Sequence, residues 1–189
     1  MAAAPEESTR AIFGAYLLAR MDPRGMEYFR NTHGAFWRSF RVAVYIAPFY
    51  AILLAMRYAM GEVSTPPLRF ITIEIIAYVI AWTAFPVIMD VITTATGRRE
   101  KFVRYIIAYN WAAILQNMLY LPLAMLSVNG FLPPDSGGFL GFIVLLVIMV
   151  YTWFITKTAL EMPAGYAAGI VGIDLALSLL INGYAEKLL

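Results

Sequence analysis

The residues of this chain that could do chemistry are one acid and three amides inside long apolar stretches. Asp174 lies near the middle of one stretch, and Asn110, Gln116 and Asn117 lie within another. Ionisable residues inside membrane-spanning segments often mark proton or solute paths. We therefore expect an intramembrane polar cluster in which Gln116 and Asn117 are the hydrogen-bond partners of Asp174. The alternatives are a relay and simple interhelical hydrogen bonding, and a single acid without a charged partner at its depth favours the second.

Catalytic and metal-binding chemistry has few candidate residues in this sequence. The absence of cysteine excludes disulfides, thiolate metal sites and cysteine nucleophiles. His33 is the only histidine. The chain contains no G-x-S-x-G, no H-E-x-x-H and no phosphate-binding glycine loop. We expect no enzymatic activity, no cofactor and no metal.

Two further groups of charged residues could form contacts. Arg57 and Glu74 lie near the same end of consecutive apolar stretches, so we expect a structural ion pair between them. A basic bend joins the second and third stretches, and its cations are Arg98, Arg99, Lys101 and Arg104. Such a bend sets topology, and each cation near an anionic lipid surface contributes about 1 kcal/mol of attraction. The basic bend is therefore a candidate contact for lipid or for a partner protein.

The elements that must position these residues are membrane helices. The chain is 61% hydrophobic and 14% charged, whereas soluble domains average about 45–50% and about 25%. A helix needs roughly 20 apolar residues to cross a bilayer. Five segments meet this length, at about 42–60, 70–92, 103–126, 139–159 and 164–183. We expect an all-α membrane protein whose five-helix transmembrane domain covers residues 42–189.

Residues 1–41 form an amphipathic lead-in to this domain. Asp22 and Pro23 have the residue types of a helix cap and a first helical turn. Aromatic residues and arginines then alternate up to Phe40, as in helices that lie among lipid headgroups. An ordinary amphipathic helix packed under the bundle explains the same pattern equally well.

Orientation follows from the distribution of the 14 Lys and Arg residues. Most of them lie on the side of the N-terminus and the basic bend, and the opposite side has only Arg57, Arg69 and Lys187. Cytoplasmic loops carry the excess of positive charge. We expect a cytoplasmic N-terminus and a C-terminus on the opposite side. The clear charge bias and the preference for arginine over lysine favour a bacterial inner membrane.

The fifth segment is marginal as an isolated span. An aspartate at its centre costs about 2.5–3.5 kcal/mol, and its Leu, Ile and Val residues return roughly 0.3–0.6 kcal/mol each. We therefore expect it to pack inside the bundle. Gly165, Gly169 and Gly172 give it a small face that suits close helix contact.

The overall pattern resembles the Ypt-interacting protein (Yip) family of five-span membrane proteins. The resemblance is carried by the lead-in at 21–29, by the hairpin that includes Thr96–Arg99, Phe102 and Ile106–Tyr109, and by the short turn between the last two spans. It implies a five-span fold and the role in membrane traffic in which eukaryotic members are implicated, whereas bacterial relatives are largely unassigned. The Asp-Leu-Tyr-Gly-Pro motif of eukaryotic members, which contact small GTPases, is absent here.

These observations lead to two functional hypotheses. The first is a non-enzymatic Yip-like scaffold or subunit that organises a membrane complex or binds lipid, anionic lipid included. Its partners would be membrane lipids and other membrane proteins or a second copy, with no nucleic acid. The second is a small transporter or transport-complex subunit built around Asp174.

Overall fold

The computed structural model describes residues 4–189, and within this range its regular elements are all helical. The N-terminal part contains three short elements: α1 (Ala4–Ala19), the 3-10 helix η1 (Pro23–Tyr28) and α2 (His33–Ser39). The long helices that follow are α3 (Arg41–Ala59), α4 (Pro67–Ala95), α5 (Arg99–Val128), α6 (Pro134–Leu160) and α7 (Ala164–Leu188).

Within residues 4–189, five helical stretches are long and apolar enough to cross a membrane, by length and composition alone. Each overlaps one of the five predicted spans and most extend beyond it, so the prediction of an all-α protein with five such helices is confirmed. The basic bend is shorter than expected, because α5 already begins at Arg99. Most of its cations therefore belong to the first turns of a helix and not to a loop.

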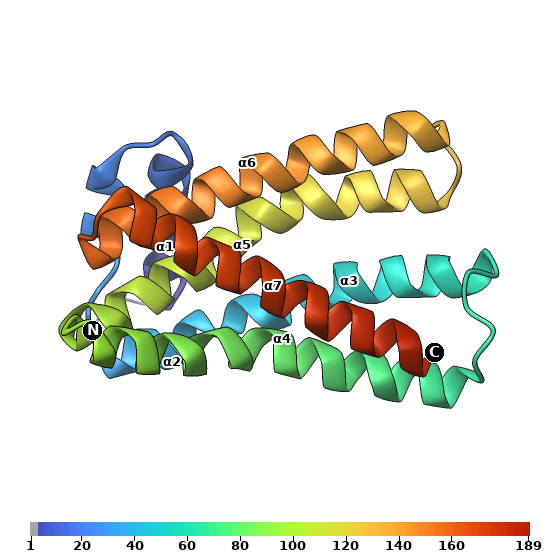
Figure 1. Ribbon diagram of the computed structural model, residues 1–189, viewed down its shortest axis with the longest axis horizontal. Helices are drawn as coiled ribbons and strands as arrows, with labels where there is room; N and C mark the ends of the chain where they lie inside the picture. Colours follow the sequence, from blue (N-terminus) through green and yellow to red (C-terminus); the bar gives the residue numbers. More distant parts are fainter. Residues whose placement is uncertain (1–3) are drawn as a thin grey trace.

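The long helices run along the longest axis of the molecule (Figure 1). The α4–α5 turn at 96–98 and the α6–α7 turn at 161–163 lie at one end, which we name the basic end. The α3–α4 and α5–α6 loops and the C-terminus lie at the other, which we name the far end. Helix α5 is central, because it packs against α3, α4 and α6 as well as α1 and α2. Helix α7 packs against α6 and α4.

The N-terminal part of the chain folds back on itself. Helix α1 turns back into η1, and the two cross at Gly14 and Gly25, which are both buried. A Cβ atom at Gly25 would lie 2.5 Å from the carbonyl oxygen of Gly14 and 2.8 Å from Cγ of Leu18. This backbone contact holds α1 and η1 together, and α1 packs in turn against α5 and α6.

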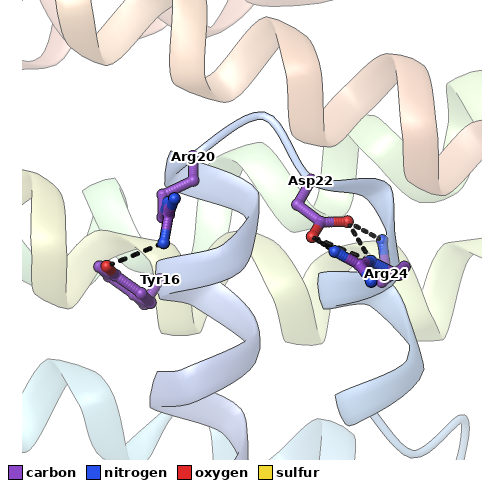
Figure 2. Close-up of polar contacts among 4 residues, drawn as sticks. All are labelled: Tyr16, Arg20, Asp22 and Arg24. Carbon is purple, nitrogen blue, oxygen red and sulfur yellow. Dashed lines mark hydrogen bonds and ion pairs between the residues drawn. The ribbon is translucent and has the colours of Figure 1, made fainter.

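The predicted cap at Asp22 is confirmed, although the element that it caps is a 3-10 helix (Figure 2). Asp22 accepts hydrogen bonds from the backbone N–H and the guanidinium of Arg24, the shortest at 2.6 Å. These hydrogen bonds lower the pKa of the Asp22 carboxyl, the side-chain bond having the larger effect. Directly after α1, the side chain of Arg20 folds back toward the hydroxyl of Tyr16 at 3.5 Å.

Within this chain, the α7 glycines do not form the close helix contact that we expected. Gly165, Gly169 and Gly172 are exposed, and a Cβ at any of them would meet nothing within 4 Å. The buried residues of α7 are instead Ala167, Ile170, Val171 and Ala185. The reason is helical phase, because the glycine face is turned away from both α4 and α6.

Candidate functional site

Asp174 is half-buried and is held by a tyrosine of α5. The hydroxyl of Tyr109 donates to both carboxylate oxygens, at 2.9 Å from Oδ1 and 3.0 Å from Oδ2. The ring of Phe85 on α4 packs against Tyr109 with a centroid distance of 4.6 Å. The tyrosine and the acid therefore join α5 to α7 beside α4.

The expected hydrogen bonds from Gln116 and Asn117 to Asp174 are wrong. Gln116 donates to the hydroxyl of Thr152 on α6 at 3.0 Å, and Asn117 donates to the carbonyl of Ala113 in its own helix at 2.8 Å. The error is one of depth. Asp174 and Tyr109 both lie ten residues into their helices, about 15 Å from the basic end, whereas Gln116 lies roughly 10 Å deeper.

Asn110, the fourth member of the expected cluster, belongs to another contact. Its side chain is fully buried, and its Nδ2 donates to Oγ of Ser39 at 2.8 Å. Ser39 donates in turn to the carbonyl of Phe36 at 2.6 Å. Oδ1 of Asn110 is buried without a hydrogen-bond partner among the described residues. This group joins α5 to the end of α2 and does not reach α7.

The structure does not bring Arg57 and Glu74 together as an ion pair. Arg57 pairs with Glu62 at 3.2 Å and lies 3.9 Å from Glu186 near the C-terminus. Glu74 is buried, and its Oε2 accepts a hydrogen bond from the hydroxyl of Tyr50 at 3.0 Å. Tyr50 and Arg57 are two turns apart, about 10 Å along α3, so only Tyr50 is level with Glu74.

The four cations of the basic bend all contact other parts of the chain. Arg98 donates to the carbonyl of Leu160 at 3.1 Å, and Arg104 donates through Nε to the carbonyl of Met26, also at 3.1 Å. The other two form ion pairs, Lys101 with Glu161 at 2.5 Å and Arg99 with Asp90 at 3.7 Å. Among the four, Arg99 has the side chain that remains mostly exposed, at 70%. The basic bend thus connects η1, α4 and the α6–α7 turn.

The contact between Lys101 and Glu161 yields a pH-dependent prediction. Hydrogen bonding and charge from Lys101 lower the pKa of the Glu161 carboxyl. A lowered pKa means that the contact stabilises the fold above the ordinary glutamate pKa and is lost as the pH falls through the folded-state pKa. We expect Lys101→Gln to raise the pKa of Glu161 toward its ordinary value. NMR titration of the labelled carboxyl measures this, and an unchanged pKa in the variant would contradict it.

A cleft that the sequence did not predict lies between α3 and α4. It has a volume of about 600 Å³ and is lined mainly by apolar and aromatic side chains. The only acid in its lining is Glu74. The lining residues are Ala47, Tyr50, Ala51, Leu54, Ala55, Tyr58, Ala59, Pro67, Phe70, Ile71, Glu74, Ile75, Tyr78 and Val79. Alanines four residues apart at Ala47, Ala51, Ala55 and Ala59 are the sequence signal that could have found it, since they leave one face of α3 without bulk.

The fold of the described residues defines the class of this protein. It is an all-helical protein with five helices long and apolar enough to span a membrane. Within residues 4–189, no three side chains of His, Asp or Glu are grouped so that they could hold a metal ion. No protein-family model matches the chain, and neither does any curated protein or solved structure.

Proposed function

We propose that this protein is a non-enzymatic integral membrane protein that binds a membrane-dissolved amphiphile between α3 and α4. The observation that carries the proposal is the apolar cleft of about 600 Å³. Ligand pockets typically have about 300–1,000 Å³ and an apolar, aromatic lining with a few polar groups. The cleft has this size and this lining, and its polar groups are the carboxylate of Glu74 and the hydroxyls of three tyrosines.

In the same proposal, the long helices cross the membrane with the basic end in the cytoplasm. The excess of Lys and Arg on the side of the N-terminus and the basic bend supports this orientation. A bacterial inner membrane, a Yip-like relationship and a role as scaffold or complex subunit are proposed on the sequence pattern alone. Protein partners or a second copy would then contact the exposed apolar faces of the long helices.

A transporter is the alternative function, and one observation favours it. Tyr109 donates to both oxygens of Asp174, which places a tyrosine–acid pair among the long helices. Gln116 and Asn117 have other partners, however, and do not extend this pair toward the far end. Amphiphile binding is therefore the function that we place first.

Filling the cleft tests the proposed function. Ala51 is exposed in the cleft lining, so Ala51→Phe adds volume there without disturbing a packed core. The probe is a long-chain alkyl alcohol that carries a photoreactive diazirine, and labelled peptides are identified by mass spectrometry. We expect saturable labelling of α3 and α4 in the wild-type protein. In the variant, the labelling should fall at least about fivefold, because overpacking costs about 1–3 kcal/mol and would weaken binding of the probe by that amount.

The matched control is Ala81→Phe, an equal change at an exposed position of α4 outside the cleft. It should leave the labelling unchanged. Equal labelling of the wild-type protein and Ala51→Phe, or no saturable labelling of the wild-type cleft at all, would refute amphiphile binding at this place.

A further inference from the structure

We infer that the ligand of the α3–α4 cleft is an amphiphile with an organic cation, such as a protonated amine, and without a phosphate. This inference rests on the proposed binding function and adds the chemical class of the ligand. It follows from the acid in the cleft wall, from the aromatic side chains of the lining, and from the absence of Lys and Arg among the lining residues.

Glu74 gives the cleft an acid without a counter-charge. Glu74 is only 5% exposed, and the other residues that line the cleft are apolar or aromatic. The hydroxyl of Tyr50 satisfies part of its hydrogen-bonding capacity at 3.0 Å, but a neutral donor leaves the negative charge in place. A buried carboxylate is costly unless an opposite charge accompanies it.

No cation of the described chain supplies that charge. Neither Lys nor Arg occurs in the lining of the cleft. The nearest basic residue on α3 is Arg57, and its guanidinium is engaged with Glu62 and Glu186. A cationic molecule in the cleft would supply the compensating charge.

The aromatic side chains of the lining favour an organic cation. Tyr50 and Tyr78 stack with ring centroids 5.3 Å apart, and Tyr58 and Phe70 lie 5.4 Å apart. The faces of aromatic rings attract ammonium groups through their quadrupoles. A carboxylate flanked by such rings is the combination expected for an ammonium group joined to an apolar body.

The same wall excludes two other occupants. An aminophospholipid would bring its phosphate close to Glu74, and the lining offers no cation to receive it. An apolar helix face from a second copy would cover the cleft but leave the charge of Glu74 unpaired. The cationic amphiphile is the occupant that satisfies both the apolar lining and the acid.

The test compares two photoreactive probes of equal chain length, the alkyl alcohol introduced above and the corresponding primary amine at neutral pH. We expect the amine to label the wild-type cleft about tenfold more efficiently, as a charged hydrogen bond to Glu74 would allow. Glu74→Gln keeps the shape and can still accept from Tyr50, so it should abolish the preference for the amine while alcohol labelling persists. Asp174→Asn, which removes an acid outside the cleft, should retain the preference.

The outcomes separate this inference from the proposed function. Saturable but equal labelling by amine and alcohol would overturn the inference and leave amphiphile binding intact. A preference for the amine that survives in Glu74→Gln would overturn it too. Stronger labelling by a diazirine-bearing phosphatidylethanolamine would exclude the phosphate-free class. Cross-links between the α3 helices of two copies, with no probe in the cleft, would overturn both proposals.

Discussion

Replacing Gly25 by alanine is expected to separate η1 from α1 and to destabilise the folded protein by about 3 kcal/mol. The new Cβ would lie 2.5 Å from the carbonyl oxygen of Gly14 and 2.8 Å from Cγ of Leu18. Overpacking of a well-packed site costs about 1–3 kcal/mol. The upper end of this range applies because the nearest atom belongs to the backbone and cannot change rotamer. Equilibrium unfolding in mild detergent, with limited proteolysis of the N-terminal part, measures the effect.

Gly172→Ala is the matched control for this change. Gly172 lies within α7, and a Cβ there would meet nothing within 4 Å. Alanine in a helix interior is more favourable than glycine by roughly 0.5–1 kcal/mol, so this variant should be as stable as the wild-type protein or slightly more stable. If Gly25→Ala unfolds at the same denaturant concentration as the wild-type protein, the close crossing of α1 and η1 does not support the fold.

The five long helices could be predicted from the sequence because each depends on a local property. A run of about 20 apolar residues is long enough to cross a bilayer, and this can be recognised without knowing what the run packs against. The cap at Asp22 could be predicted for the same reason, since the cap, the following proline and Arg24 are adjacent in the chain. Local chemistry thus specified the elements.

The partners of the polar residues could not be predicted, because they depend on how the helices cross. Counting from the middle of each apolar run placed Asp174 level with Gln116. The structure has α5 extended to Arg99, which brings Tyr109 level with Asp174 instead. Position along α3 likewise decided that Tyr50, and not Arg57, would lie level with Glu74, whereas Arg57 lies near Glu186 close to the C-terminus.

The partners of the four cations in the basic bend could not be predicted from the sequence either. Four cations close together suggest a surface for anionic lipid, yet a positive charge can equally hold a carbonyl of its own chain. The structure uses Arg98 and Arg104 in the second way, and each contacts a carbonyl far away in sequence. Arg99 alone of the four remains mostly exposed. The sequence cannot separate these roles, because they depend on where η1 and the α6–α7 turn lie.

Arg104→Gln is therefore expected to destabilise the protein by about 1.5–3 kcal/mol without weakening its contact with anionic lipid. The guanidinium donates twice to the carbonyl of Met26, through Nε and Nη2, and hydrogen bonds to charged groups contribute about this much. Its loss leaves α5 without this link to η1. Equilibrium unfolding measures the destabilisation, and co-purified phosphatidylglycerol measures lipid contact.

Arg99→Gln should behave in the opposite way, which makes it the matched control. Its side chain is 70% exposed and its ion pair with Asp90 is long, at 3.7 Å, so stability should change by no more than about 1 kcal/mol. An exposed cation near an anionic surface contributes about 1 kcal/mol, which corresponds to roughly fivefold weaker retention of phosphatidylglycerol in this variant. If both variants lose lipid equally and neither loses stability, the basic bend acts as one lipid-binding surface, and its contact with Met26 does not stabilise the fold.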